Sequence, residues 1–80
     1  MTKTIFDLKY RAVIAQLKTT RLRRGLTQTQ LGQAIGLSRN WLGKIELCEL
    51  KLDILRFCWL CKALELDPSR LIKQLDTDSR

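Results

Sequence analysis

The stretch 27–46, TQTQLGQAIGLSRNWLGKIE, decides the fold of this chain, because two short helical patterns meet in it at a glycine. Thr27 and Gln30 form a capping box, in which each side chain bonds to the backbone of the other residue at the start of a helix. Gly36 is expected to end this helix in a backbone conformation that other residues resist. Apolar residues at helical spacing are expected to form its buried face, namely Leu31, Ala34 and Ile35.

The second helical pattern begins at Ser38, whose side chain is expected to cap the helix. Leu42 and Ile45 lie three residues apart, so their side chains share one face and are expected to be buried. Two helices joined by a short turn that contains glycine form a helix-turn-helix unit. We expect Gly32 to let the helices approach closely and Leu37 to fill the space beneath the turn. The stretch therefore predicts a helix-turn-helix whose second helix projects its other face outward.

That outward face carries polar and basic residues, and it lacks the Glu–Lys pairs that a solvated helix face would show. Its residues are Ser38, Arg39, Asn40, Trp41, Gly43 and Lys44. Their donors suit the base edges and phosphates of the DNA major groove, which is wide enough for one helix. Arg39 suits guanine and Asn40 suits adenine, and each such contact gives ~1–3 kcal/mol of discrimination. Gly43 removes bulk in mid-helix, which would let the backbone come close to DNA.

The remainder of the chain also has apolar residues at helical spacing and no lasting β-alternation, so the predicted fold class is all-α with five helices. The first helix is expected over 7–24, ended by Gly25. The fourth is expected over 53–64, and the fifth begins with Asp67 as cap and Pro68 in the first helical position. The core residues expected from these three helices are Ile14, Leu17, Ile54, Phe57, Cys58, Cys61, Leu64, Leu71, Ile72 and Leu75.

Length and charge limit the possible partners. The length predicts a single domain, 1–80, with its core over 9–75 and a short C-terminal tail over 76–80. Up to Lys44, nine Lys or Arg residues face one acidic residue, which gives +8, whereas six basic and seven acidic residues after it give −1. A polyphosphate is the natural partner for the basic half, although a solvated, solubilising surface is the alternative. No apolar run reaches ~18–20 residues and nothing resembles a signal peptide, so we expect a soluble, cytoplasmic protein.

The sequence offers little for metal, cofactor or catalytic chemistry. Three cysteines and no histidine are present, and Cys58 and Cys61 form a C-x-x-C pair. Structural zinc needs four ligands, and only Cys48 could be a third, while a thioredoxin-type pair follows a strand. We therefore expect the pair to lie in the core, with no metal and no cofactor. The absence of a nucleophile–base pair and of a glycine-rich phosphate loop argues against an enzyme.

The segment 21–46, RLRRGLTQTQLGQAIGLSRNWLGKIE, resembles the core of the lambda-repressor and Cro-like helix-turn-helix family, also called the Xre family. The similarity spans about 17–75, and the spacing within 21–46 has no gaps. The matching residues are Arg21, Gly25, Thr27, Gln28, Leu31, Gly36, Ser38, Arg39, Leu42, Ile45 and Glu46. The resemblance implies a five-helix lambda-repressor-like DNA-binding domain with its helix-turn-helix at the second and third helices.

The resemblance also implies roles for individual residues. Gln28 would touch a phosphate and the side chain beneath Arg39. Arg21 and Glu46 would form a partly buried ion pair with a structural role, not a DNA-reading one. The full predicted DNA-binding set is Arg23, Arg24, Thr27, Gln28, Ser38, Arg39, Asn40, Trp41, Gly43 and Lys44.

The second half of the chain departs from the family pattern. Where many relatives have a polar loop with Gly and Pro, this chain reads LCELKLD over 47–53, and the helix after it carries further apolar residues. A satellite apolar cluster beneath the loop is one explanation. The favoured explanation is a partner surface, with a second copy as the partner, because two recognition helices about 34 Å apart enter successive major grooves. The predicted homodimer interface consists of Leu47, Leu50, Leu52, Leu55 and Trp59.

These features predict a sequence-specific regulator that binds double-stranded DNA. We expect a repressor or autoregulator on a two-fold symmetric operator, encoded by a bacterium or phage and associated with the nucleoid when bound. The alternative is an antitoxin or a controller of restriction–modification genes that uses the same fold to bind a protein such as a toxin. The terminal segment DTDSR, 76–80, is short for a toxin-binding tail.

Overall fold

The computed structural model describes residues 5–76, which contain five α-helices and no strand. The helices are α1 Ile5–Arg23, α2 Gln28–Ala34, α3 Arg39–Glu46, α4 Ile54–Leu64 and α5 Pro68–Asp76. The predicted all-α class with five helices is therefore confirmed. α1 begins two residues before and ends one residue before its predicted bounds. The expected C-terminal tail, 76–80, lies outside the described residues apart from Asp76.

Local side-chain bonds explain where the later helices begin. Thr27 Oγ1 accepts from the Gln30 backbone N–H at 3.0 Å, and the Gln30 side chain accepts from the Thr27 N–H at 2.9 Å. Ser38, Asp53 and Asp67 likewise accept backbone N–H groups at the starts of α3, α4 and α5. Each bond satisfies a donor that has no partner within its helix. All four predicted caps are confirmed.

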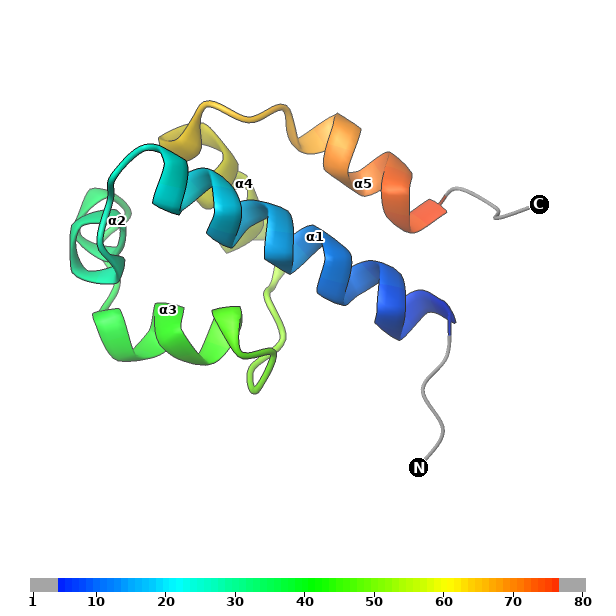
Figure 1. Ribbon diagram of the computed structural model, residues 1–80, viewed down its shortest axis with the longest axis horizontal. Helices are drawn as coiled ribbons and strands as arrows, with labels where there is room; N and C mark the ends of the chain where they lie inside the picture. The colour runs from blue at the N-terminus through cyan, green and yellow to red at the C-terminus, as the bar shows by residue number, and fades with distance from the viewer. Residues whose placement is uncertain (1–4, 77–80) are drawn as a thin grey trace.

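The long helix α1 packs against α3, α4 and α5, and α5 lies along it (Figure 1). α2 and α3 pack together at one end, and α2 also contacts α4. The buried cluster between the helices is Val13, Ile14, Leu17, Leu31, Leu42, Ile45, Phe57, Leu60, Cys61, Leu64 and Leu71. This arrangement holds the outer surface of α3 away from the core.

Four core predictions are wrong, because the packing of α1, α2 and α5 decides which faces are covered. The buried face of α4 consists of Phe57, Leu60, Cys61 and Leu64. Ile54 is 74% exposed and Cys58 is also exposed, since both lie off this face. Ala34 in α2 and Ile72 in α5 are exposed as well. Leu37, which was expected to fill the space beneath the turn, is half-buried.

Candidate nucleic-acid interface

The corner between α2 and α3 depends on a close backbone approach. A Cβ atom at Gly32 would lie 2.5 Å from the Leu37 carbonyl oxygen, which is inside the range of real contacts. The Leu37 N–H also donates to the Gly32 carbonyl at 2.8 Å. Gly36, between them, has a φ of +74°, a left-handed conformation that costs other L-residues ~1–2 kcal/mol. These contacts set the angle at which α3 leaves the corner.

The two faces of α3 differ in burial and chemistry. Leu42 and Ile45 are buried in the core cluster, as predicted. The residues of α3 and its cap that stay exposed are Ser38, Arg39, Asn40 and Lys44. Trp41, which was predicted to flank the DNA-reading face, is half-buried and packs against the core cluster. The exposed part of α3 is therefore narrower than the predicted set, and it carries Arg, Asn and Lys donors.

Gln28 at the start of α2 lies against α3. Its Nε2 donates to Glu46 Oε1 at 3.0 Å, and its amide lies 3.7 to 3.8 Å from the place of a Cβ on Gly43. The glycine thus leaves α3 narrow where the Gln28 side chain crosses it. The expected role of Gly43 was close approach of the backbone to DNA, whereas in this structure a side chain of α2 lies at that position.

The ion pair that the resemblance implies is present between α1 and the end of α3. Arg21 Nε and Nη2 lie 2.7 and 3.0 Å from the two carboxylate oxygens of Glu46. Arg21 Nη1 donates to the Leu26 carbonyl at 2.8 Å, and the two charged side chains are only 7% and 6% exposed. Such two-point geometry is the strong form of an Arg–carboxylate contact. It ties α3 to α1.

Two open recesses lie along the α2–α3 surface, and their linings combine basic and polar side chains. The one on α3, of about 290 Å³, is lined by Gln28, Arg39, Asn40, Gly43, Lys44 and Leu47. The other, of about 440 Å³, is lined by Arg21, Thr27, Gln28, Thr29 and Arg39. Neither lining contains an acidic residue, so both recesses suit an anionic or acceptor-rich ligand. Thr29 was missed by the sequence analysis, although its place next to Gln28 at the α2 start is a signal for it.

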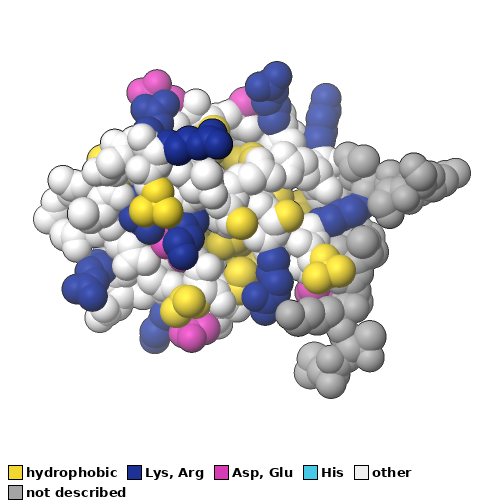
Figure 2. All heavy atoms as spheres, viewed as in Figure 1, with side chains coloured by type: hydrophobic (Ala, Val, Ile, Leu, Met, Phe, Trp, Pro, Cys, Tyr) yellow, Lys and Arg dark blue, Asp and Glu magenta, His cyan; other side chains and the backbone are white. Residues whose placement is uncertain are grey.

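Basic side chains predominate over acidic ones on the face shown in Figure 2. Arg23 and Arg24, at the end of α1, are both exposed. Arg24 Nη2 lies 3.3 Å from Glu65 Oε1, in an exposed pair of the kind that contributes little stability. Arg24 therefore offers less free charge to a phosphate than Arg23 does.

The predicted partner surface is mostly exposed. Leu47, Leu50, Leu55 and Trp59 are exposed, whereas Leu52 is half-buried and packs against the core. The Leu52 N–H donates to the Tyr10 hydroxyl of α1 at 3.0 Å, which holds this part of the loop inward. Leu52 therefore offers less surface to a partner than the other four residues do.

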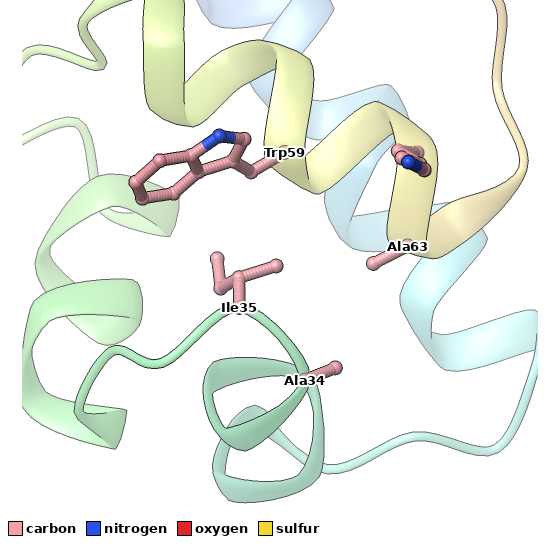
Figure 3. Close-up of a pocket in the computed structure, with 5 residues that line it drawn as sticks. Ala34, Ile35, Trp59 and Ala63 are labelled. Atoms are coloured by element: carbon pink, nitrogen blue, oxygen red, sulfur yellow. The ribbon is translucent and has the colours of Figure 1, made fainter.

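An apolar groove of about 500 Å³ lies between α2 and α4, lined by Ala34, Ile35, Trp59, Lys62 and Ala63. Trp59 and Ile35 point toward each other across it, and the two alanines lie beside them (Figure 3). Arg56 lies over the Trp59 ring, 5.9 Å from its centroid. Trp59 is 39% exposed, so part of its surface is open to solvent in the groove.

The cysteines lie in different environments. Cys61 is buried in the core, and burial raises the pKa of its thiol to about 11, with smaller contributions from Cys58 and Asp67. Cys58 is exposed, so the pair does not share one environment. Within residues 5–76, no three His, Cys, Asp or Glu side chains come together as metal ligands. In the same range, no helix combines the length and apolar character that crossing a bilayer needs.

Comparisons with known proteins agree with this geometry. Residues 15–71 match the family model of a helix-turn-helix domain, so the chain belongs to this family. Its structure is similar to that of an XRE-family like protein from Pseudomonas syringae pv. tomato, with a TM-score of 0.81 and 29% sequence identity over 90% of this chain and 88% of that one. None of the curated proteins compared with the chain matches it. The chain is an Xre-type helix-turn-helix protein and, at that level, a DNA-binding regulator.

Proposed function

We propose that this protein is a sequence-specific transcriptional regulator, a repressor or autoregulator, that places α3 in the major groove of a two-fold symmetric operator. This proposal depends on the exposure of Arg39, Asn40 and Lys44 on α3. The opposite face of the helix is buried through Leu42 and Ile45. A helix held by one face and bearing bidentate donors on the other fits direct readout of base edges. Protein concentration is the simplest control of such a regulator.

Charge supports DNA as the ligand. The nine basic residues up to Lys44 face a single acid, Asp7, in the half of the chain that carries the helix-turn-helix. Phosphate binding releases counterions, so affinity should fall steeply as salt concentration rises. In this proposal Arg23, together with the residues at the start of α2, contacts phosphates and sets the position of the protein on the duplex.

Selection of duplexes from a random pool tests this proposal. The wild-type protein should enrich a two-fold symmetric sequence, and Arg39→Ala should lose preference at one position of each half-site, at a cost of ~1–3 kcal/mol. Arg23→Ala should weaken all duplexes alike. Arg70→Ala, which removes an exposed arginine of α5, is the matched control and should change neither. Equal losses on selected and random duplexes for Arg39→Ala would contradict base reading by this side chain.

The proposed regulator acts as a homodimer. Two copies must hold their α3 helices about 34 Å apart to enter successive major grooves. The exposed apolar side chains available for this contact are Leu47, Leu50, Leu55 and Trp59. Leu55 and Trp59 lie four residues apart on one face of α4, and the groove beside Trp59 extends that face. Apolar surface of this kind commonly marks a contact with another chain.

A further inference from the structure

The loop between α3 and α4 combines exposed apolar side chains with an unpaired carboxylate. Leu47 and Leu50 are both exposed, and Glu49 lies between them in the chain and is also exposed. Within the described part of the chain, the Glu49 carboxylate forms no ion pair or side-chain hydrogen bond. The backbone of the loop is nevertheless well held, since the Glu49 and Leu50 N–H groups both donate to the Lys44 carbonyl. The loop is thus an ordered apolar projection that carries one negative charge.

The groove beside Trp59 has the opposite character. Its wall is apolar, formed by Ile35, Trp59 and the alanines, and Lys62 is its single charged lining residue. Lys62 is exposed and has no ion pair among residues 5–76. The acidic residues at the two ends of α4 already have basic partners, because Asp53 pairs with Arg56 and Glu65 pairs with Arg24. The groove therefore suits an apolar side chain accompanied by a carboxylate.

The loop precedes the start of α4, whereas the groove lies beside its second half, so the two features are separated along one helix. Two α4 helices packed antiparallel about a two-fold axis would bring each loop to the groove of the other copy. Such isologous contacts form twice and close the assembly as a dimer.

We propose that the loop at Leu47 and Leu50 of one copy occupies the Ile35–Trp59 groove of a second copy, with Glu49 paired to Lys62 of the partner subunit. The inference rests on the proposed homodimer and identifies the surfaces through which the two copies contact each other. Each copy carries a net charge of +7, so association needs a local attraction that offsets the overall repulsion. Two Glu49–Lys62 pairs at the edge of an apolar contact supply that attraction, and they also select the antiparallel arrangement.

A charge exchange tests the pairing. Glu49→Lys and Lys62→Glu should each raise the dimer dissociation constant at least tenfold in sedimentation equilibrium. Each variant replaces both attractive pairs of the dimer by pairs of like charges. The double variant, Glu49→Lys with Lys62→Glu, should return within about threefold of wild type. Arg70→Glu, which makes the same change in net charge as Lys62→Glu at an exposed position of α5, should dimerise like wild type. All three positions changed, 49, 62 and 70, are exposed, so circular dichroism should show unchanged helix content.

The outcomes separate this inference from the proposed function. Weakened single variants and a restored double variant support the pairing. A wild-type protein that stays monomeric at 100-fold above its DNA-binding concentration overturns it, as does a double variant no better than the singles. Sequence-selective DNA binding that persists in either of these cases leaves sequence-specific regulation standing, whereas a monomeric wild type also overturns the proposed homodimer. A wild-type dimer that prefers no duplex leaves the pairing standing and overturns sequence-specific regulation.

Discussion

Replacing Glu46 by alanine should remove a large part of the stability of the fold. Two of the three bonds that Arg21 makes go to this carboxylate, at 2.7 and 3.0 Å, and only the bond to the Leu26 carbonyl would remain. An ion pair that is 7% and 6% exposed leaves an uncompensated buried cation when one partner is removed, which costs ~3–5 kcal/mol. The total stability of an 80-residue domain is about 4–12 kcal/mol. Glu46→Ala should therefore remove from about a quarter of this stability to all of it.

Urea unfolding followed by circular dichroism measures this loss, at one fixed protein concentration because dimerisation would shift the curve. With a slope near 1 kcal/mol per molar, the midpoint should fall by about 3 M or more. The double variant Arg21→Met with Glu46→Leu is the control, since apolar residues of similar volume often replace a buried pair at little cost. It should recover most of the stability. A loss below ~1 kcal/mol for Glu46→Ala, typical of an exposed pair, would refute the buried-cation argument.

Three further predictions concern the backbone, a helix cap and the thiols. Gly36→Ala should cost ~1–2 kcal/mol in thermal unfolding because φ is +74° there, whereas Gly43→Ala should be neutral or stabilise by up to ~1 kcal/mol, since its Cβ would meet only ordinary contacts. Thr27→Ala should cost about 1 kcal/mol through loss of the capping box, and an equal melting temperature would contradict this. Cys58 should react with a thiol reagent in the native state and Cys61 only after unfolding. Burial raises the pKa of Cys61 from 9.0 to about 11, so between these pH values the thiol stays protonated in the folded protein but ionises in the unfolded chain. The free energy of unfolding should therefore fall as pH rises from 9 to 11. The Cys61→Ala variant should not show this fall.

The local features of the fold were predictable because each depends on neighbours in sequence. A cap such as Thr27 or Asp53 bonds to a backbone group only three residues away, so its pattern is visible in the chain. The corner was predictable for the same reason, since Gly32 and Leu37 are five residues apart and bond directly. The family resemblance adds the Arg21–Glu46 pair, which joins residues 25 positions apart and has no local signal.

The buried face of α4 was not predictable, because the helix is apolar on nearly every side. Its sequence ILRFCWLCKAL allows several stripes, and only the positions of α1, α2 and α5 select the one that contains Leu60. The contact of the Gln28 side chain with α3 was not predictable for a similar reason. It follows from the narrow surface at Gly43 and the acceptor at Glu46, which meet Gln28 only after the corner has formed.

The attachment of α3 by two buried side chains has a consequence for how such proteins diversify. Leu42 and Ile45 anchor the helix, while Arg39, Asn40 and Lys44 contribute nothing to the core. Surface substitutions away from buried contacts usually change stability by less than about 0.5 kcal/mol. The outer positions can therefore mutate almost independently of folding, and a library randomised at these three sites should remain folded wherever it introduces neither proline nor glycine into the helix. A scaffold of this kind can acquire new targets without first acquiring new stability.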